Sequence, residues 1–149
     1  MIYWFTGQPG AGKTVLAKKL SYWLNINKHS LPFIIDGDDI RELFSNKDYS
    51  IKGRVENVGT AQRIAHYLHN QGKDVIVALV APYVDQREDF KKLVGIENMV
   101  EFYVHTSEPR ERDHFKAIAY TPPVSDYVDI DTTTDTPEQS FKIIKKWVQ

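Results

Sequence analysis

The chain contains no cysteine among its 149 residues, which excludes disulfide bonds and metal sites built on thiolates. Such a composition is typical of a reducing compartment. The chain also has no excess of charge of one sign, because 19 basic residues stand against 20 acidic ones and leave a formal net charge of −1. Nucleic-acid binding requires clustered positive charge, so we expect no nucleic-acid partner.

Long apolar runs are missing as well. No stretch approaches the roughly 20 apolar residues that a membrane-spanning helix needs, so we expect no membrane association. The chain enters an apolar strand at its first residue, which predicts that there is no signal peptide and that the protein is cytoplasmic. A hydrophobic content of 42% and a charged content of 26% are those of a soluble globular protein, here one domain over residues 1–149.

The stretch Gly7-Gln8-Pro9-Gly10-Ala11-Gly12-Lys13-Thr14 fits the pattern G-x-x-x-x-G-K-[ST]. Residues 1–5 before it are apolar and aromatic, which predicts a buried strand. After it, apolar residues recur at helical spacing from Leu16 to Leu24. A strand, a glycine loop and a helix in this order form a phosphate-binding site. The alternative is a chance glycine turn ahead of a helix.

The residue types of this loop suit phosphate chemistry. Glycines let successive backbone N–H groups turn toward a phosphate without a Cβ in the way, and the helix N-terminus adds partial positive charge. We expect Lys13 to reach the β- and γ-phosphates of ATP and the Thr14 hydroxyl to ligate Mg²⁺. The residues expected to hold the nucleotide are Gly7, Gly10, Ala11, Gly12, Lys13 and Thr14.

Strands and helices alternate along the rest of the chain, which predicts an α/β three-layer sandwich with a mostly parallel central sheet. Residues 136–139, Thr-Pro-Glu-Gln, predict a capping box at the start of the last helix. Residues 107–125, called here the lid segment, are interpreted as a mobile segment over the site. Expected strands span residues 1–5, 31–35, 74–80, 99–105 and 127–130, and expected helices begin near residues 13, 40, 54, 85 and 137, with loops at 25–30 and 45–53.

Acidic residues follow the second predicted strand, in the stretch Asp36-Gly37-Asp38-Asp39. Ligands of open α/β sheets bind at the carboxyl ends of the strands, so these carboxylates lie where chemistry is expected. A carboxylate beside Lys13 can stay ionised and accept a proton during phosphoryl transfer. Asp38 and Asp39 could instead be N-caps of the next helix.

From the first predicted strand to about Gly95 the chain resembles the adenylylsulfate kinases. That family has a strand ending in D-G-D-N-x-R, a loop F-S-x-x-D-R-x-E-N, and a strand ending in S-P-Y or S-P-H. Here Asp36-Gly37-Asp38-Asp39-Ile40-Arg41, Tyr49-Ser50-Ile51-Lys52-Gly53-Arg54-Val55-Glu56-Asn57 and Ala81-Pro82-Tyr83 follow in the same order. The resemblance implies a P-loop kinase that uses ATP and Mg²⁺ to phosphorylate the 3′-hydroxyl of adenylylsulfate, with a homodimer as the candidate assembly.

The resemblance also implies roles for individual residues. Asp36 and Asp38 match the acids that hold Mg²⁺ through water and take the proton of the acceptor hydroxyl. Arg41, Arg54 and Asn57 match residues that hold the phosphosulfate group. Tyr49 stands where the family stacks a phenylalanine on the acceptor's adenine, Arg112 is similar to a lid arginine near the ATP base and phosphates, and Lys116 could clamp the acceptor.

Plainer interpretations and departures from the family stay open. Arg41 and Arg54 could pair with Glu42 and Glu56 on the surface, and Tyr49 could serve packing alone. Ala81 replaces the family's serine, Gly53 replaces an aspartate, Gly59 and Thr60 stand in place of two arginines, and the family's lid motif K-G-L-Y-K-K-A-R is absent. The alternatives to an adenylylsulfate kinase are a kinase for another nucleotide, such as a cytidine diphosphate derivative, and a nucleotide-binding module that transfers no phosphate.

Overall fold

The structure, a computed structural model, describes residues 1–110 and 116–148. In these residues one five-stranded sheet forms the centre, with the strand order β2-β3-β1-β4-β5 and every neighbouring pair parallel. Ile2 of β1 lies opposite Val75 of β3 and Met99 of β4. The strands are β1 Ile2–Thr6, β2 Phe33–Asp36, β3 Val75–Ala78, β4 Met99–His105 and β5 Tyr127–Asp131.

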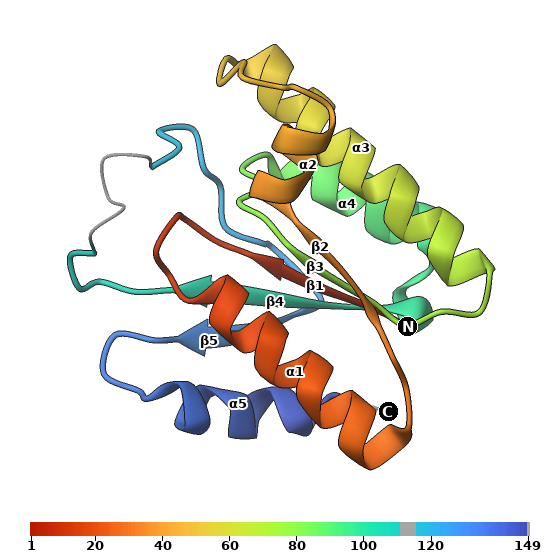
Figure 1. Cartoon of the computed structure of the whole chain (residues 1–149). Helices are drawn as coiled ribbons and strands as arrows, with labels where there is room; N and C mark the ends of the chain where they lie inside the picture. Colours follow the sequence, from red (N-terminus) through yellow and green to blue (C-terminus); the bar gives the residue numbers. More distant parts are fainter. Residues whose placement is uncertain (111–115, 149) are drawn as a thin grey trace.

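Helices cover both faces of the sheet (Figure 1). Helices α1 and α5 pack on one face, and α3 and α4 pack on the other, which confirms the predicted three-layer sandwich. Helix α2 follows β2 directly and contacts α3. The helices are α1 Lys13–Lys28, α2 Gly37–Leu43, α3 Ile51–Asn70, α4 Val84–Val94 and α5 Pro137–Lys145, with a 3₁₀ turn at Ile96–Asn98.

The two cores are built from alternate residues of the same strands. Trp4 of β1 packs against Phe90 of α4, with ring centroids 5.4 Å apart. The neighbouring Phe5 points to the opposite face and stacks on Phe102 of β4 at 4.8 Å. Because helices bury both faces, β1 is apolar at almost every position, as is usual for a central parallel strand.

Four local predictions were wrong. Helix α2 begins at Gly37 rather than near residue 40, because the Asp36 side chain caps it by accepting from the Asp38 N–H. Helix α1 continues to Lys28 rather than stopping at residue 24, because residues 25–28 form a polar last turn that is mostly exposed to solvent. Helix α3 begins at Ile51 rather than at residue 54, because the Ser50 side chain caps it by accepting from the Gly53 N–H. Strand β2 is an edge strand rather than a buried one, and its Phe33 side chain is 47% exposed.

The predicted capping box at the start of α5 is confirmed. The Thr136 side chain accepts a hydrogen bond from the Gln139 N–H, and the Gln139 side chain accepts from the Thr136 N–H, so the capping box is complete. No helix in residues 1–110 and 116–148 is long and apolar enough to cross a membrane.

Candidate functional site

The phosphate loop connects β1 to α1 at the carboxyl end of the sheet. Gly7 has a φ of 150°, and a Cβ on it would lie 2.0 Å from the backbone oxygen of Val104 in β4. Gly12 is the N-cap of α1 with a φ of 109°, a left-handed conformation that a side chain would strain. Gly7 therefore allows the loop to turn tightly against the sheet, and Gly12 allows α1 to begin with its N-terminus facing the loop.

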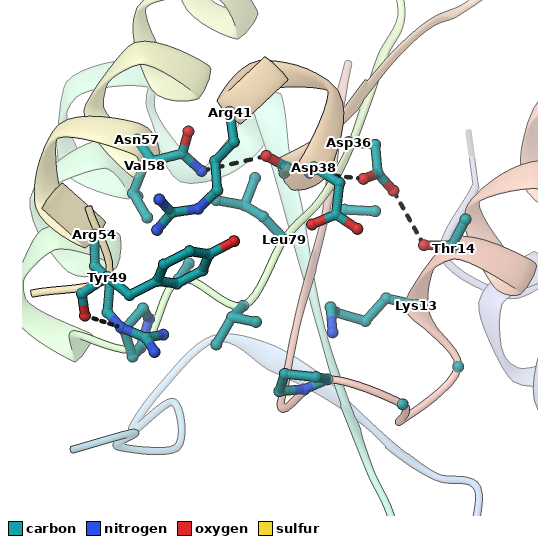
Figure 2. A pocket seen from close by; sticks show the side chains of 18 of the residues that line it. Lys13, Thr14, Asp36, Asp38, Arg41, Tyr49, Arg54, Asn57, Val58 and Leu79 are labelled. Carbon is teal, nitrogen blue, oxygen red and sulfur yellow. Dashed lines mark hydrogen bonds between the residues drawn. The ribbon is translucent and has the colours of Figure 1, made fainter. Parts of the chain in front are cut away.

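Lys13 lies at the opening of this loop. Its side chain is only 8% exposed, and its Nζ donates to the backbone oxygen of Gln8 at 2.9 Å. Figure 2 shows the ammonium group pointing into the space between the loop and the acidic residues of α2. The ammonium group of Lys13 therefore lies between the phosphate loop and the acidic residues of α2, where a transferred phosphoryl group would carry negative charge.

Thr14 and Asp36 are brought together from α1 and β2. The Thr14 Oγ1 donates to the Asp36 Oδ2 at 3.1 Å, and the Asp36 Oδ1 accepts from the Asp38 N–H at 2.9 Å (Figure 2). The second contact makes Asp36 the N-cap of α2, so the interpretation of Asp38 and Asp39 as caps was wrong. The Asp38 carboxylate is left at the cavity wall.

The oxygens of Thr14 and Asp36 are hard ligands of the type that Mg²⁺ prefers. Within residues 1–110 and 116–148, no group of three histidine, cysteine, aspartate or glutamate side chains could hold a metal ion by itself. The paired oxygens of Thr14 and Asp36 fit Mg²⁺, which usually takes one or two protein oxygens and completes its shell with water and substrate phosphates.

A cavity of about 460 Å³ lies between the phosphate loop, the ends of β2 and β3, and helices α2 and α3. Its size is within the usual range of ligand sites, roughly 300–1,000 Å³. Eight of the residues singled out from the sequence line it together: Lys13, Thr14, Asp36, Asp38, Arg41, Tyr49, Arg54 and Asn57. Gly10 and Gly12 line it too, whereas Ala11 is buried beneath the loop.

On the side of this cavity formed by α2, α3 and the loop between them, two arginines lie near one aromatic ring. The Arg41 guanidinium carbon lies 3.9 Å from the centre of the Tyr49 ring, and that of Arg54 lies 5.7 Å from it. The Arg54 Nε donates to the Tyr49 backbone oxygen at 3.0 Å. Partial burial lowers the pKa of Arg41 from its usual value, and the positive charge of Arg54 adds to this.

Residues 46–50, called here the acceptor loop after the role predicted for Tyr49, owe their shape to Arg41 and Gly53. The Arg41 Nη1 donates to the Asp48 backbone oxygen at 2.9 Å and to the Asn46 Oδ1 at 3.1 Å. A Cβ on Gly53 would lie 2.1 Å from the Asp48 oxygen, so the loop can fold onto α3 only because residue 53 has no side chain. Neither Arg41 nor Arg54 forms an ion pair with Glu42 or Glu56 among the described residues, so the surface-pair interpretation was wrong.

Asn57 of α3 brings a buried hydrogen-bond acceptor to the cavity. Its side chain is 7% exposed, and its Nδ2 donates to the Gly37 backbone oxygen at 3.4 Å (Figure 2). Its Oδ1 is buried and has no hydrogen-bond partner in the part of the chain that the structure describes. A buried carbonyl oxygen without a partner is costly, so this atom is suited to accept a hydrogen bond from a ligand.

The geometry can be compared with known proteins. The model of the adenylylsulphate kinase family matches residues 1–140 of the chain. The chain belongs to this family. Its relatives include the adenylyl-sulfate kinase of Pseudomonas aeruginosa, 33% identical over 99% of this chain and 85% of that protein, and adenylyl-sulfate kinase 3 of Arabidopsis thaliana, 30% identical over 91% and 67%.

Solved structures agree with this assignment. The hexameric APS kinase of Thiobacillus denitrificans has a TM-score of 0.78 and 27% identity, covering 97% of this chain and 28% of that one. The Mycobacterium tuberculosis APS kinase in complex with AMPPNP and APS has a TM-score of 0.77 at 23% identity, covering 97% and 95%, and shares the fold. Membership of this kinase family makes the chain an enzyme that transfers a phosphoryl group to a hydroxyl group.

The lid segment of this adenylylsulfate kinase family member is described only in part. Arg112 lies outside the described residues, and Lys116 is exposed and does not line the cavity. Arg110 is described, and its Nη2 donates to the Thr132 backbone oxygen at 3.0 Å. The Thr132 Oγ1 in turn donates to the Ala11 oxygen at 2.7 Å, so Arg110 lies beside the phosphate loop.

Sequence reasoning missed three charged residues that lie beneath the site. Arg87 of α4, Lys91 of α4 and Glu101 of β4 are almost completely buried, and the Glu101 carboxylate pairs with both cations. The signal was available at Glu101, a charged residue inside the apolar run of β4, because a buried carboxylate requires a buried cation.

Proposed function

We propose that the chain transfers the γ-phosphoryl group of ATP to the 3′-hydroxyl of adenylylsulfate and releases ADP and 3′-phosphoadenylylsulfate. One observation carries this function: a single cavity holds both the phosphate-loop residues and the residues that match the family's acceptor site. Nucleotide binding alone would not require the second set. Family membership supports the same reaction.

The donor half of the proposed site would hold Mg·ATP. The backbone N–H groups of the phosphate loop and Lys13 would neutralise the phosphates, and Thr14 and Asp36 would hold Mg²⁺ together with phosphate oxygens and water. The ion would supply a positive charge that stabilises the charge developing on the β- and γ-phosphate oxygens. Arg112 stays a proposed contact to the ATP base and phosphates.

The acceptor half would orient the hydroxyl group for in-line transfer. Arg41 and Arg54 carry planar donor groups suited to the phosphosulfate anion, and Tyr49 offers a ring for the adenine. The Asn57 Oδ1 would accept a hydrogen bond from the ligand. As the acceptor oxygen bonds to the γ-phosphorus, the bond to the β,γ-bridging oxygen breaks, and Asp38 or Asp36 takes the hydroxyl proton.

A second candidate is a related kinase for another nucleotide, such as a cytidine diphosphate derivative. The exposed position of Lys116 favours it, because this side chain does not reach the cavity to clamp an adenine. Of the departures from the family pattern, Ala81 lines the cavity, whereas Gly59 and Thr60 lie in the middle of α3 and do not line it.

The test is ADP release with Mg·ATP and a panel of nucleotides, using the wild type, Asp38→Asn and Asp39→Asn. Asp39 is the matched control, because it is the next residue along α2 but does not line the cavity. We expect rapid turnover with adenylylsulfate alone, loss in Asp38→Asn, and near-normal rates in Asp39→Asn. Turnover with another nucleotide only would support the second candidate, and ATP binding without any turnover would support the non-catalytic module.

We also propose a homodimer in solution. The Thiobacillus denitrificans relative is hexameric, so chains with this fold do assemble. Tyr22 of α1 and Leu31 before β2 are more than two thirds exposed, and both line a shallow depression between these elements. Sedimentation equilibrium would measure the mass, and a monomer at micromolar concentration would contradict the proposal. The small-molecule substrate and the absence of cysteine fit a cytoplasmic enzyme.

A further inference from the structure

A buried ion cluster between helix α4 and strand β4 is formed by Arg87, Lys91 and Glu101. Arg87 and Glu101 are each 1% exposed, and the Arg87 Nε lies 3.1 Å from the Glu101 Oε1. The Lys91 Nζ lies 2.7 Å from the other carboxylate oxygen and 2.8 Å from the Glu88 Oε1. Burial raises the pKa of the Glu101 carboxyl, and the ammonium group of Lys91 opposes this effect.

The Arg87 Nε–H is not aligned for a hydrogen bond with Glu101, so charge holds the pair. Because removing two charges from water is costly, a buried ion pair is weak evidence for stability. The role of this ion cluster is therefore better judged from the other groups that its charged side chains bind.

Arg87 binds two backbone segments that are far apart in sequence. Its Nη1 donates to the Ala81 oxygen, and its Nη2 donates to the Thr121 oxygen. Ala81 follows β3, lines the cavity and has a φ of 44°, a left-handed conformation that is uncommon for a residue with a side chain. The Thr121 N–H donates to the oxygen of Pro82, the next cavity residue, at 2.9 Å.

Thr121 is the last residue of the segment 117–121. The first residue of this segment, Ala117, binds the phosphate loop. The Ala117 N–H donates to the Gln8 Oε1, and the Gln8 Nε2 donates to the Ala117 oxygen, both at 2.9 Å. The backbone oxygen of the same Gln8 accepts from the Lys13 Nζ. Between the two ends, the Tyr120 hydroxyl lies 3.0 Å from the Thr6 Oγ1 at the end of β1. Residues 117–121 therefore bridge the phosphate loop and the cavity wall after β3.

We propose that Arg87 is a positioning residue for phosphoryl transfer. From its buried site it fixes Ala81 and Pro82 on one side and residues 117–121 on the other, which keeps the cavity wall in register with the phosphate loop. The arrangement matters because in-line transfer tolerates little error, and a displacement of about 1 Å can cost roughly 10²-fold in rate. The proposal rests on the proposed kinase activity, and Arg87 does not line the cavity.

Arg87→Lys tests the bridge. A lysine keeps the charge beside Glu101 but has one nitrogen, which cannot serve Glu101, Ala81 and Thr121 at once. Lys91→Met is the matched control, because Lys91 shares Glu101 yet its backbone partner is Ser125, outside the bridge. Gln8→Ala opens the other end of the bridge without touching the buried ion cluster.

Two steady-state quantities would be measured for each variant: kcat for acceptor phosphorylation per folded enzyme, and the share of ATP that is hydrolysed without phosphorylating the acceptor. In Arg87→Lys and Gln8→Ala we expect kcat to fall by roughly 10- to 100-fold and the hydrolysed share to rise. In Lys91→Met we expect lower stability but an unchanged hydrolysed share. Equal shares in all variants and in the wild type would overturn the proposal.

A second measurement does not depend on the acceptor. Hydrogen exchange of residues 117–121 would be followed with and without a non-hydrolysable ATP analogue. In the wild type and in Lys91→Met, we expect the analogue to slow exchange at the Ala117 and Thr121 amides. In Arg87→Lys the Thr121 amide should no longer respond. A wild type that shows this response but phosphorylates no adenylylsulfate would refute the proposed substrate and leave the bridge intact, whereas an equal response in Arg87→Lys would refute the bridge.

Discussion

Substitutions of Asp36 should separate an effect on the catalytic rate from an effect on the stability of the fold. Its two carboxylate oxygens have different partners: Oδ1 accepts from the Asp38 N–H at 2.9 Å, and Oδ2 accepts from the Thr14 hydroxyl at 3.1 Å. In Asp36→Asn the amide oxygen can keep the first contact, and asparagine caps helices about as well as aspartate. The amide carries no negative charge, so it holds Mg²⁺ poorly and cannot take a proton.

We therefore expect the free energy of unfolding of Asp36→Asn to stay within about 0.5 kcal/mol of the wild type. Its kcat should fall by about 10²- to 10⁴-fold, which corresponds to roughly 3–5 kcal/mol in the activation free energy. Asp36→Ala should show the same catalytic loss and also lose the cap of α2, which costs about 0.5–2 kcal/mol in stability.

Urea unfolding and coupled ADP release would measure the two quantities in parallel. Asp39→Asn serves as the control, because it removes a charge from the same helix turn without changing the cavity wall. An Asp36→Asn enzyme that keeps its kcat within a few-fold of the wild type would refute the assignment of Asp36 to the metal and the proton.

Three further substitutions test other parts of the structure. Gly7→Ala places a Cβ 2.0 Å from the Val104 oxygen, so we expect a loss of about 1–3 kcal/mol in stability; an unchanged melting temperature would contradict the described loop. Thr136→Ala removes the side-chain half of the capping box of α5 and should cost about 1 kcal/mol in urea unfolding, whereas Thr136→Asn should cost much less. Tyr49→Leu should raise the KM for adenylylsulfate about tenfold, since stacking on a base contributes roughly 1–3 kcal/mol, and Tyr49→Phe should not. Equal KM values in the two Tyr49 variants would exclude a stacking role.

The fold was predictable because its signals are local. An unbroken apolar run is enough to indicate a central parallel strand, and the residues of a capping box lie within one helical turn of each other. The start of α3 was predicted three residues late, because it depends on how the acceptor loop folds onto Gly53. Asp48 and Gly53 are only five positions apart, but their contact follows no apolar periodicity, so the sequence pattern does not report it.

The residues of the site also fall into two groups: those with a local signal in the sequence and those without one. Lys13 and Thr14 were predictable from one spaced pattern, and Asp36 from its place at the end of a strand. The bond between Gln8 and Ala117 joins residues 109 positions apart, and the bond between Arg87 and Thr121 joins residues 34 positions apart. Neither pair forms a spacing pattern, so only the folded chain brings these partners together.

Gly53 limits which side chains this protein can accept at position 53. The family pattern has an aspartate at this position, but here the Asp48 backbone occupies the space that any side chain would need. An aspartate at position 53 would therefore push the acceptor loop off α3 and disturb the Arg41 contacts to Asn46 and Asp48. The residue type at position 53 and the fold of the acceptor loop are thus coupled, so neither can change without the other.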